Sequence, residues 1–307
     1  MRFVGLFALA CSVLVAPRWA RAADDAEPSE PAKTTLEEAP VDATAPAASD
    51  WCRPDVEALA NDVCYAKGPN KDPKRRTLVI FLHGLTEDGA GWQHSLQKGM
   101  AIAGKRLDFS ALMPRGRNGV GPGRKQSTIA WPGGEEVRKL YEDDVIKEWF
   151  DAKAEIEKKE GAPFDQVFVM GFSNGAYYAS SLALRGRLDV DGYAVFAGGS
   201  ANGSAAGKQT KNRKPLFVGV ATKDATAKKG KELVKALDAL KWPHRTDSRP
   251  VGHVVADGQL DRAIEYLRDP KKPASKKTAE QRPATKKKKK SAASGATKPA
   301  KNTKKKK

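Results

Sequence analysis

The sequence predicts an α/β domain with a mostly parallel central sheet covered by helices on both faces. Three observations favour this class. Between residues 51 and 270, apolar segments of strand length alternate with segments of helical periodicity. Residues 77–82 (Thr-Leu-Val-Ile-Phe-Leu) are almost wholly apolar, which is typical of strands buried on both faces of a parallel sheet. A second such strand, residues 166–170, leads through a glycine-flanked turn into a small-residue helix at 176–180.

The first 22 residues read as a secretory signal. Arg2 supplies the positive start, residues 3–15 form an apolar run, and Ala20-Arg21-Ala22 is a small-x-small cleavage site. The run is shorter than the about 20 apolar residues that a permanent span requires. We therefore expect export to a secreted or periplasmic, envelope-associated location, with no transmembrane span in the mature chain. An uncleaved N-terminal anchor is the alternative.

Charge separates the two flanks from the domain between them. Residues 23–50 contain eight acidic residues and one lysine, without apolar periodicity, and are expected to be a disordered acidic linker. Residues 271–307 contain 16 lysines and arginines against one glutamate and no large apolar side chain, and are expected to be a disordered tail. The net charge of +18 therefore resides mainly in the tail, and the folded domain is assigned to residues 51–270.

Two cysteines, Cys52 and Cys64, remain after the signal is removed. An even number in an exported chain indicates a disulfide at the start of the domain, with a short helix expected over 54–61 between them. Two free thiols are the alternative if the chain is not exported. The sequence contains no C-x-x-C or H-E-x-x-H spacing, so no metal site is predicted.

The remaining elements follow in order. Helical spacing covers 90–103, a strand is expected at 109–113, and residues 114–134 read as a Gly/Arg/Pro-rich loop. The later expected elements are a helix over 141–160, strands at 193–197, 216–220 and 248–251, and helices over 225–240 and 257–267.

The turn after the second strand carries Gly-Phe-Ser-Asn-Gly at 171–175. This is a G-x-S-x-G sequence between strand and helix, where glycines two residues before and after a serine permit close backbone packing. Ser173 is therefore the candidate nucleophile.

A serine hydroxyl needs a base to take its proton and a third group to orient that base. His253, before the last helix, is the predicted base, with His244 as the alternative. Asp224, which leaves the strand at 216–220, is the predicted orienting carboxylate, although an aspartate there could also serve as a helix N-cap. Asp191 and Asp257 are less well placed.

A tetrahedral intermediate also needs preorganised N–H donors. We predict the backbone N–H groups of Asn174, directly after the nucleophile, and of Leu85, in the loop after the strand at 77–82. Gly84 would permit close backbone approach there, or would simply end the strand in a turn. His94, on an amphipathic helix, is expected to be a surface or half-buried residue.

These motifs, in chain order, resemble the phospholipase/carboxylesterase branch of the α/β-hydrolases. They comprise Leu-His-Gly-Leu-Thr-Glu-Asp-Gly-Ala-Gly-Trp at 82–92, the Trp131 loop, the 171–175 turn, Asp224, and Gly252-His253. More distantly, the chain is similar to polyhydroxybutyrate-depolymerase-like and feruloyl-esterase-like secreted esterases. The chain departs from the branch in carrying Asn174 where many carboxylesterases have Gln.

The resemblance implies an α/β-hydrolase fold without a large lid domain. It implies cleavage of carboxylic esters through an acyl-enzyme, with a small or polymeric ester as substrate and neither a metal nor an organic cofactor. It also places His83, Gly84 and Trp131 beside the substrate.

Two basic features are left outside this interpretation. Arg115, Arg117 and Arg124 could face an anionic substrate group from the rim of the site, or lie in a solvated loop. The lysine-rich tail could attract a polyanion without specificity, such as envelope lipid, acidic polysaccharide or nucleic acid, or could be a solubilising extension. A catalytically degenerate hydrolase-fold protein, held at a surface by this tail, is the alternative function.

Overall fold

The computed structural model describes residues 50–87, 89 and 91–272. The predictions for the signal, for the lysine-rich tail from residue 273 onward and for most of the acidic segment lie outside the described residues. No helix in the part of the chain that the structure describes is long and apolar enough to cross a membrane.

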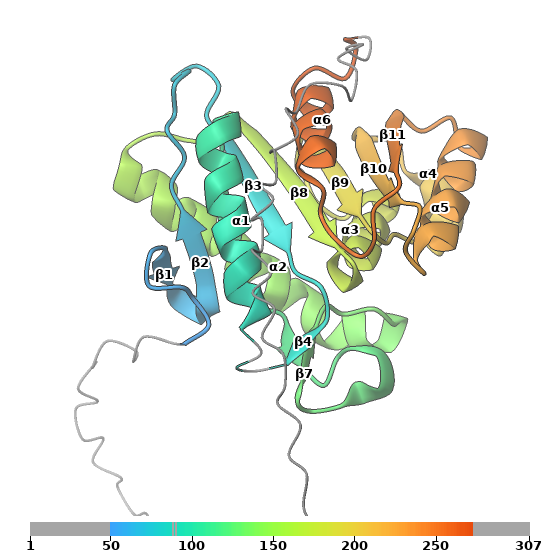
Figure 1. Cartoon of the computed structure of the whole chain (residues 1–307), viewed down its shortest axis with the longest axis horizontal. Helices are drawn as coiled ribbons and strands as arrows, with labels where there is room; N and C mark the ends of the chain where they lie inside the picture. The colour runs from blue at the N-terminus through green and yellow to red at the C-terminus, as the bar shows by residue number, and fades with distance from the viewer. Residues whose placement is uncertain (1–49, 88, 90, 273–307) are drawn as a thin grey trace, which may run out of the picture. The chain divides into compact units, whose positions relative to one another are not determined.

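An eight-stranded sheet forms the centre of the described domain, in the order β1-β2-β5-β3-β8-β9-β10-β11 (Figure 1). The strands are β1 (Glu57–Leu59), β2 (Val63–Ala66), β3 (Thr77–Leu82), β5 (Ser110–Met113), β8 (Gln166–Phe172), β9 (Gly192–Phe196), β10 (Leu216–Ala221) and β11 (His244–Arg249). All neighbours from β5 to β11 pair in parallel, whereas β1 and β2 are antiparallel additions at one edge. The predicted mostly parallel sheet is confirmed.

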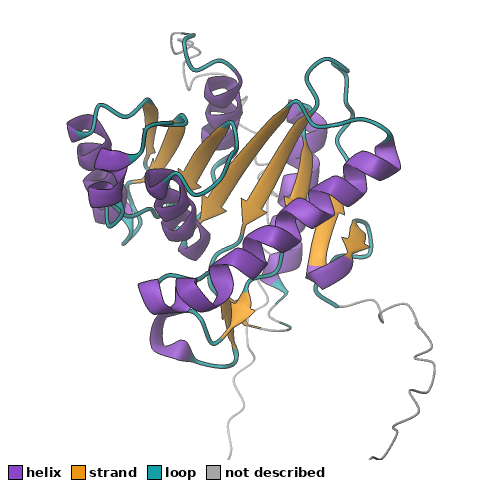
Figure 2. Cartoon of the chain, turned by 180° about the vertical axis from the view of Figure 1, so that it is seen from behind, coloured by secondary structure: helices purple, strands orange, loops and turns teal. Residues whose placement is uncertain are grey.

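Helices cover both faces of this sheet. One face packs against α1 (Trp92–Leu107) and α6 (Asp257–Arg268). The other packs against α2 (Glu135–Glu160), α3 (Asn174–Arg185) and α5 (Ala227–Ala239), as the view from behind shows (Figure 2). A short helix, α4 (Ser204–Gln209), lies against α3.

The central strands are buried because their sequences are apolar on both sides. Every residue of β3 is buried, and Leu78 and Ile80 contribute to one apolar cluster while Val79 and Phe81 contribute to the other. Burying one such side chain stabilises the fold by about 1.5–3 kcal/mol. The middle of the sheet is therefore a rigid support for the loops at the carboxyl ends of its strands.

The helix predicted over residues 54–61 is wrong. This segment instead contains β1, which forms an antiparallel hairpin with the following β2, and Asn61 turns the chain between them with a positive φ of 57°. All four residues of β2 are buried, and β2 also pairs with β5, so tertiary burial decides the conformation. A disulfide joins Cys52 to Cys64 and ties the start of the domain to this hairpin.

Residues 114–134 are more ordered than the predicted loop. β6 (Arg117–Asn118) and β7 (Thr128–Ala130) form a small three-stranded sheet with β4 (Thr86–Glu87), which follows the β3 loop. Strands this short carry no periodic signal in the sequence. α2 also begins at Glu135, before the predicted start at 141.

The last strand is longer than the predicted 248–251. β11 begins at His244 and is largely polar because it is the edge strand of the sheet. Its buried Asp247 is paired with Arg249 at 2.7 Å and with Arg262 at 3.1 Å. Charged residues at a sheet edge hide the alternating pattern that would have marked this strand.

Candidate active site

Ser173 lies in a strained turn between β8 and α3. Its φ of 52° and ψ of −115° fall outside the regions that a residue with a side chain normally adopts. The flanking glycines make this turn possible: a Cβ at Gly171 would lie 2.2 Å from the Gly175 carbonyl oxygen, and one at Gly175 would lie 2.1 Å from the Leu82 carbonyl oxygen. Only glycine fits at either position, so the G-x-S-x-G pattern is required by the geometry.

The structure brings Ser173, His253 and Asp224 together from three loops at the carboxyl edge of the sheet. The Ser173 Oγ lies 2.9 Å from His253 Nε2, and His253 Nδ1 lies 2.6 Å from Asp224 Oδ2. The His253 ring also packs against the Phe172 ring, with 4.8 Å between centroids. The imidazole is thus held from both nitrogens, with one directed at the candidate nucleophile.

Asp224 is fixed independently of the histidine. Its Oδ1 accepts a hydrogen bond from the Thr226 amide at 3.1 Å, and its Oδ2 accepts one from the Thr226 hydroxyl at 2.8 Å. Burial pushes the pKa of Asp224 upward, but the hydrogen bonds from His253 and Thr226 outweigh burial and hold the pKa below its ordinary value. The carboxylate therefore stays ionised next to the imidazole. Thr226 was not singled out in the sequence, because a threonine in a loop gives no signal of this role.

The alternative bases and acids lie elsewhere. His244, at the start of β11, contacts the Trp242 carbonyl oxygen at 2.9 Å. His94 is half-buried on α1 and contacts the Asp50 carbonyl oxygen at 3.0 Å. Asp191 accepts a hydrogen bond from the Val167 amide at 2.7 Å, at the opposite end of β8 from Ser173. None of these contacts joins the Ser173 cluster.

The two predicted N–H donors, of Asn174 and Leu85, belong to two loops that meet at the Ser173 turn. Asn174 is the first residue of α3, so its N–H has no acceptor within the helix. The Leu85 loop is held against the same turn: the Gly175 N–H donates to the His83 carbonyl at 3.1 Å, and a Cβ at Gly84 would lie 3.2 Å from the Ser173 Cβ. Leu85 itself is exposed. Gly84 thus lies beside the candidate nucleophile, Ser173.

The side chains of His83 and Trp131 are buried. Trp131 is fully buried and stacks on Tyr178, and His83 lies between the Trp51 and Trp131 rings at centroid distances of 5.1 Å and 4.8 Å. The Trp131 indole N–H donates to the His83 carbonyl oxygen at 2.8 Å. Trp131 lines the cavity next to the Ser173 turn and His83 does not, so the expected contact of these side chains with substrate stays a prediction.

Burial fixes the protonation of His83. The Gly116 N–H donates to its Nε2 at 3.0 Å, so the proton lies on Nδ1, which contacts the Gly84 carbonyl oxygen at 2.5 Å. A second proton, on Nε2, would point at the Gly116 N–H, so the charged form of the ring would lose this hydrogen bond. Burial, together with the nearby Arg115 charge, lowers the pKa of His83 to about 4.

Stability should consequently fall as the pH is lowered from about 6.5 to about 4. In this window the unfolded chain binds a proton at residue 83 and the folded protein does not, so unfolding is favoured by up to about 3 kcal/mol. Urea unfolding at several pH values should show a shallower pH dependence in His83→Gln, whose amide oxygen can still accept from Gly116. Equal pH dependence in the two proteins would contradict this assignment.

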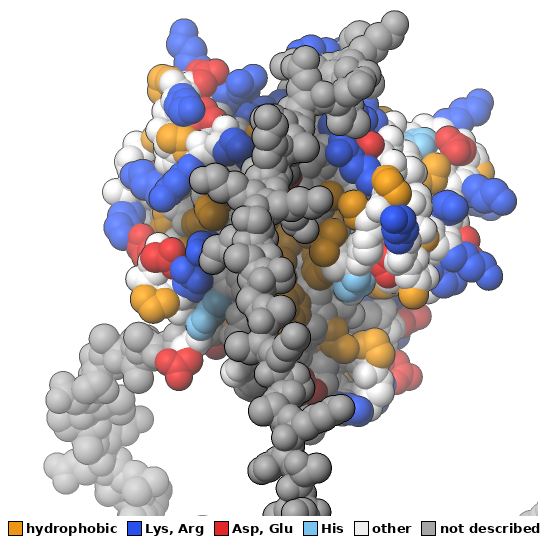
Figure 3. Space-filling view, in the orientation of Figure 1, with side chains coloured by type: hydrophobic (Ala, Val, Ile, Leu, Met, Phe, Trp, Pro, Cys, Tyr) orange, Lys and Arg blue, Asp and Glu red, His pale blue; other side chains and the backbone are white. Residues whose placement is uncertain are grey.

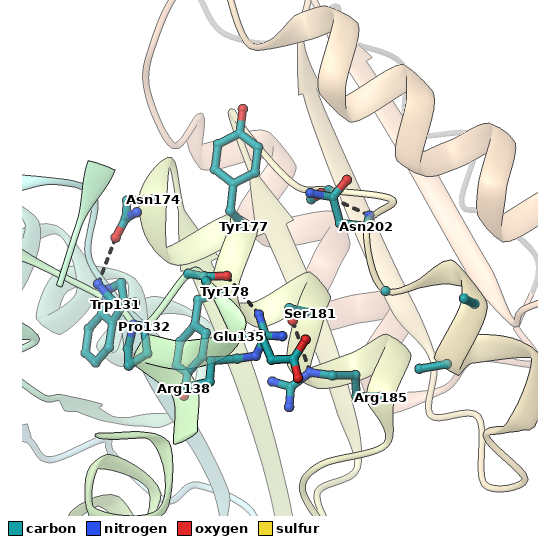
Figure 4. A pocket seen from close by; sticks show the side chains of 16 residues that line it. Trp131, Pro132, Glu135, Arg138, Asn174, Tyr177, Tyr178, Ser181, Arg185 and Asn202 are labelled. Carbon is teal, nitrogen blue, oxygen red and sulfur yellow. Dashed lines mark hydrogen bonds between the residues drawn. The ribbon is translucent and has the colours of Figure 1, made fainter. Parts of the chain in front are cut away.

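A cavity of about 540 Å³ opens next to the turn, along α3 (Figure 4). Its wall begins at Asn174, whose Oδ1 accepts a hydrogen bond from the Trp131 backbone N–H at 2.9 Å. Tyr177, Arg138 and Asn202 also line it. Sequence reasoning missed these three residues because they come from three segments far apart in the chain, and no local motif joins them.

The three arginines of the 114–134 segment do not converge on the site. Arg115 lies over the Trp51 ring and donates to Asn118 at 2.8 Å, Arg117 pairs with Glu148 on α2, and Arg124 lies 3.8 Å from Glu136. Each of the three arginines therefore has a separate partner, which favours the alternative that they lie in the loop without converging on a ligand.

The fold and the three-residue cluster define the class: the chain has the α/β-hydrolase fold and presents Ser, His and Asp at the carboxyl edge of its sheet. No protein-family model matches the chain. The chain is 28% identical to acyl-protein thioesterase 1 of Eremothecium gossypii over 139 residues, which make up 41% of this chain and 55% of the thioesterase. The match thus spans about half the length of that curated relative.

Two solved structures illustrate the likeness in fold. The chain superposes on substrate-bound FphF, a fluorophosphonate-binding serine hydrolase of Staphylococcus aureus, with a TM-score of 0.50 and 14% identity, covering 70% of this chain and 94% of FphF. The Bacillus cereus carboxylesterase gives a TM-score of 0.47 and 18% identity, covering 68% and 94% of the two chains. The predicted α/β-hydrolase fold is confirmed.

Proposed function

We propose that the protein is an exported serine esterase that cleaves carboxylic esters through an acyl-enzyme intermediate. The observation that carries this proposal is the hydrogen-bonded series from Ser173 to His253 to Asp224, at 2.9 Å and 2.6 Å. A nucleophile, a base within hydrogen-bond reach and a carboxylate that orients the base are the parts that acyl transfer to serine requires. The similarity to a thioesterase supports the same class of reaction.

In the proposed mechanism, His253 Nε2 takes the Ser173 proton as Oγ attacks the ester carbonyl carbon. The carbonyl oxygen becomes an oxyanion, which the N–H groups of Asn174 and Leu85 stabilise. When the tetrahedral intermediate collapses, the protonated His253 gives its proton to the departing alcohol oxygen, and Ser173 carries the acyl group. Water then attacks the acyl-enzyme, with His253 again taking and returning a proton, and the carboxylic acid leaves.

The positions of the donors support this sequence of steps. Asn174 and Leu85 lie on the two strand-end loops that the Gly175 to His83 hydrogen bond holds together, so both N–H groups are in place before the substrate binds. Their fixed position matters because removing one such donor typically costs about 2.7–4 kcal/mol of barrier lowering. The strained φ of Ser173 is the strand-to-helix turn geometry that exposes a serine nucleophile in hydrolases of this fold.

Covalent labelling provides the test. A fluorophosphonate probe should modify Ser173 and no other serine, and mass spectrometry of the digested protein should place the adduct on the peptide that contains residues 171–175. Denatured protein is the control, because the adduct requires the folded cluster of Ser173, His253 and Asp224. Absence of labelling in the folded protein would contradict the proposal and would favour the degenerate-hydrolase alternative.

We further propose that the lysine-rich tail attracts polyanions after export. The tail holds 16 lysines and arginines against one glutamate, whereas the basic side chains of the described domain are dispersed and interleaved with acidic ones on the face shown in Figure 3. Lysine-rich segments bind polyanions through counterion release, which weakens steeply with salt. Envelope lipid, acidic polysaccharide and nucleic acid all carry the required charge.

Protein recovered from the export compartment, with an N-terminus near Ala23, should bind heparin at low salt and elute as salt rises. Replacing the lysines at 286–290 and 304–307 with glutamine should shift elution to markedly lower salt without changing ester hydrolysis. Recovery of the protein from the cytoplasm, with residues 1–22 still attached, would contradict export. Wild-type protein that passes through heparin at low salt would contradict polyanion binding.

A further inference from the structure

A groove runs from the residue after the nucleophile along one side of α3. The cavity of about 540 Å³ is lined on that helix by residues spaced at helical intervals, which are Asn174, Tyr177, Tyr178, Ser181 and Arg185. The twelve residues of α3 extend about 18 Å. A pocket of this length and volume has the size of a small-molecule binding site.

The walls of the groove combine apolar surface with a few polar and charged side chains. Glu135 and Arg138 face α3 from the start of α2, and Asn202 lies on the opposite wall (Figure 4). Two of the three charges that line the groove are already neutralised. Arg185 makes a bidentate pair with Glu142 at 2.7 Å and 2.6 Å, and Glu135 pairs with Lys139 at 3.0 Å.

Arg138 is the remaining charge. Its Nη1 donates to the Gly133 carbonyl oxygen at 2.8 Å, and no carboxylate lies within 4.0 Å of it among the residues that the structure describes. The Nε–H and the Nη2 hydrogens are left, and this edge of a guanidinium is the one that binds a carboxylate with two parallel hydrogen bonds. The groove therefore has one cation with an unused bidentate face.

Arg138 is within reach of a substrate bound at Ser173. The Asn174 side chain accepts a hydrogen bond from the Trp131 backbone N–H. Two residues further along the chain, the Gly133 carbonyl oxygen accepts one from the Arg138 guanidinium. Two hydrogen bonds and three residues of backbone place the guanidinium within roughly 15 Å of Asn174. The groove connects these points.

In the proposed mechanism, the acyl part of the substrate is the part that would enter this groove. The departing alcohol oxygen must lie next to His253, which gives it a proton, and His253 is not among the residues that line the groove. The groove instead begins at Asn174, whose N–H would bind the carbonyl oxygen. The substituent on the acyl side of the carbonyl is thus directed along α3.

We propose that the groove selects esters whose acyl chain ends in a carboxylate, and that Arg138 binds this carboxylate. The inference rests on the proposed esterase function and names its substrate class: half-esters of dicarboxylic acids. Asn202 and Tyr177 supply further hydrogen-bonding groups along the same groove. Arg138 is a specificity-determining residue and takes no part in the proton transfers.

Matched pairs of p-nitrophenyl esters test this inference. The hemiadipate and the hemisuberate each have a neutral counterpart in which the free carboxylate is a methyl ester. In Arg138→Gln, the ratio of kcat/KM for the charged ester to that for its neutral counterpart should fall about tenfold to a hundredfold, because a charge-assisted bidentate contact is lost. In Arg138→Lys, which keeps the charge but loses the planar guanidinium, this ratio should lie between the wild-type value and that of Arg138→Gln.

Arg124→Gln is the control, since Arg124 pairs with Glu136 outside the groove and should leave the ratio as in wild type. An unchanged ratio in Arg138→Gln would overturn the inference while leaving the esterase proposal intact. If the wild-type protein hydrolyses neither ester, the esterase proposal fails. Calorimetric binding of adipate then decides the inference alone: affinity that Arg138→Gln weakens supports it, and equal affinity overturns it.

Discussion

Replacing Ser173 with alanine should lower kcat for p-nitrophenyl butyrate by at least about 10⁴-fold and abolish the initial burst of p-nitrophenol. The wild-type burst reports acylation of the Ser173 Oγ, which His253 Nε2 contacts at 2.9 Å. Without Oγ there is no acyl-enzyme. Only the N–H donors and substrate binding remain, and these account for a small residual rate over water.

Ser173→Ala should lower the rate of catalysis without lowering the stability of the fold. Ser173 is half-buried at the start of a helix, and its alanine variant keeps the backbone hydrogen bond from its N–H to the Phe196 carbonyl. The unfolding midpoint should therefore change little. Ser95→Ala, an exposed serine on α1, is the matched control and should retain wild-type kcat. Wild-type turnover in Ser173→Ala would contradict the assignment of the nucleophile.

The centre of the fold was predictable because its sequence pattern and its burial agree. β3 has the predicted residues, and β8 with α3 carries the serine turn where the pattern placed it. The edges were not predictable. The segment that contains β1 reads as a helix, and only the end of β11 reads as a strand, because pairing with neighbouring strands, rather than local sequence, gives these segments their conformation.

The candidate site likewise has residues that the sequence predicts and residues that it does not. Ser173, Asp224 and His253 could be found from the sequence because each follows a recognisable strand, and parallel strands bring their carboxyl ends to one edge. Arg138, which lines the groove, could not be found from the sequence in this way. Arg138 is one of many basic residues in the sequence, and only the packing of α2 beside α3 distinguishes it from Arg115, Arg117 and Arg124.

Replacing Asp224 with asparagine should lower kcat by about 10³-fold to 10⁴-fold without unfolding the protein. The reason lies in the two hydrogen bonds from Thr226. Its backbone N–H donates to Asp224 Oδ1 and can only donate, so an asparagine would place its oxygen there and its NH₂ group at the position of Oδ2. This NH₂ group would face His253 Nδ1, now 2.6 Å from Oδ2.

His253 would then have to accept a hydrogen bond at Nδ1 and carry its proton on Nε2. An Nε2–H pointing at the Ser173 Oγ cannot take the serine proton, so the nucleophile stays protonated. Nitrogen NMR of labelled histidine should show the proton of His253 on Nδ1 in the wild type and on Nε2 in Asp224→Asn. A structural role for Asp224 alone would not move this proton.

Thr226→Val separates orientation from charge. It removes the hydroxyl that donates to Asp224 Oδ2 at 2.8 Å but keeps the backbone N–H and the carboxylate. One hydrogen bond to a charged group is lost, so kcat should fall only about threefold to tenfold, with the His253 proton still on Nδ1. If Asp224→Asn and Thr226→Val have equal effects, the carboxylate does not set the tautomer of His253, and a different residue must orient the base.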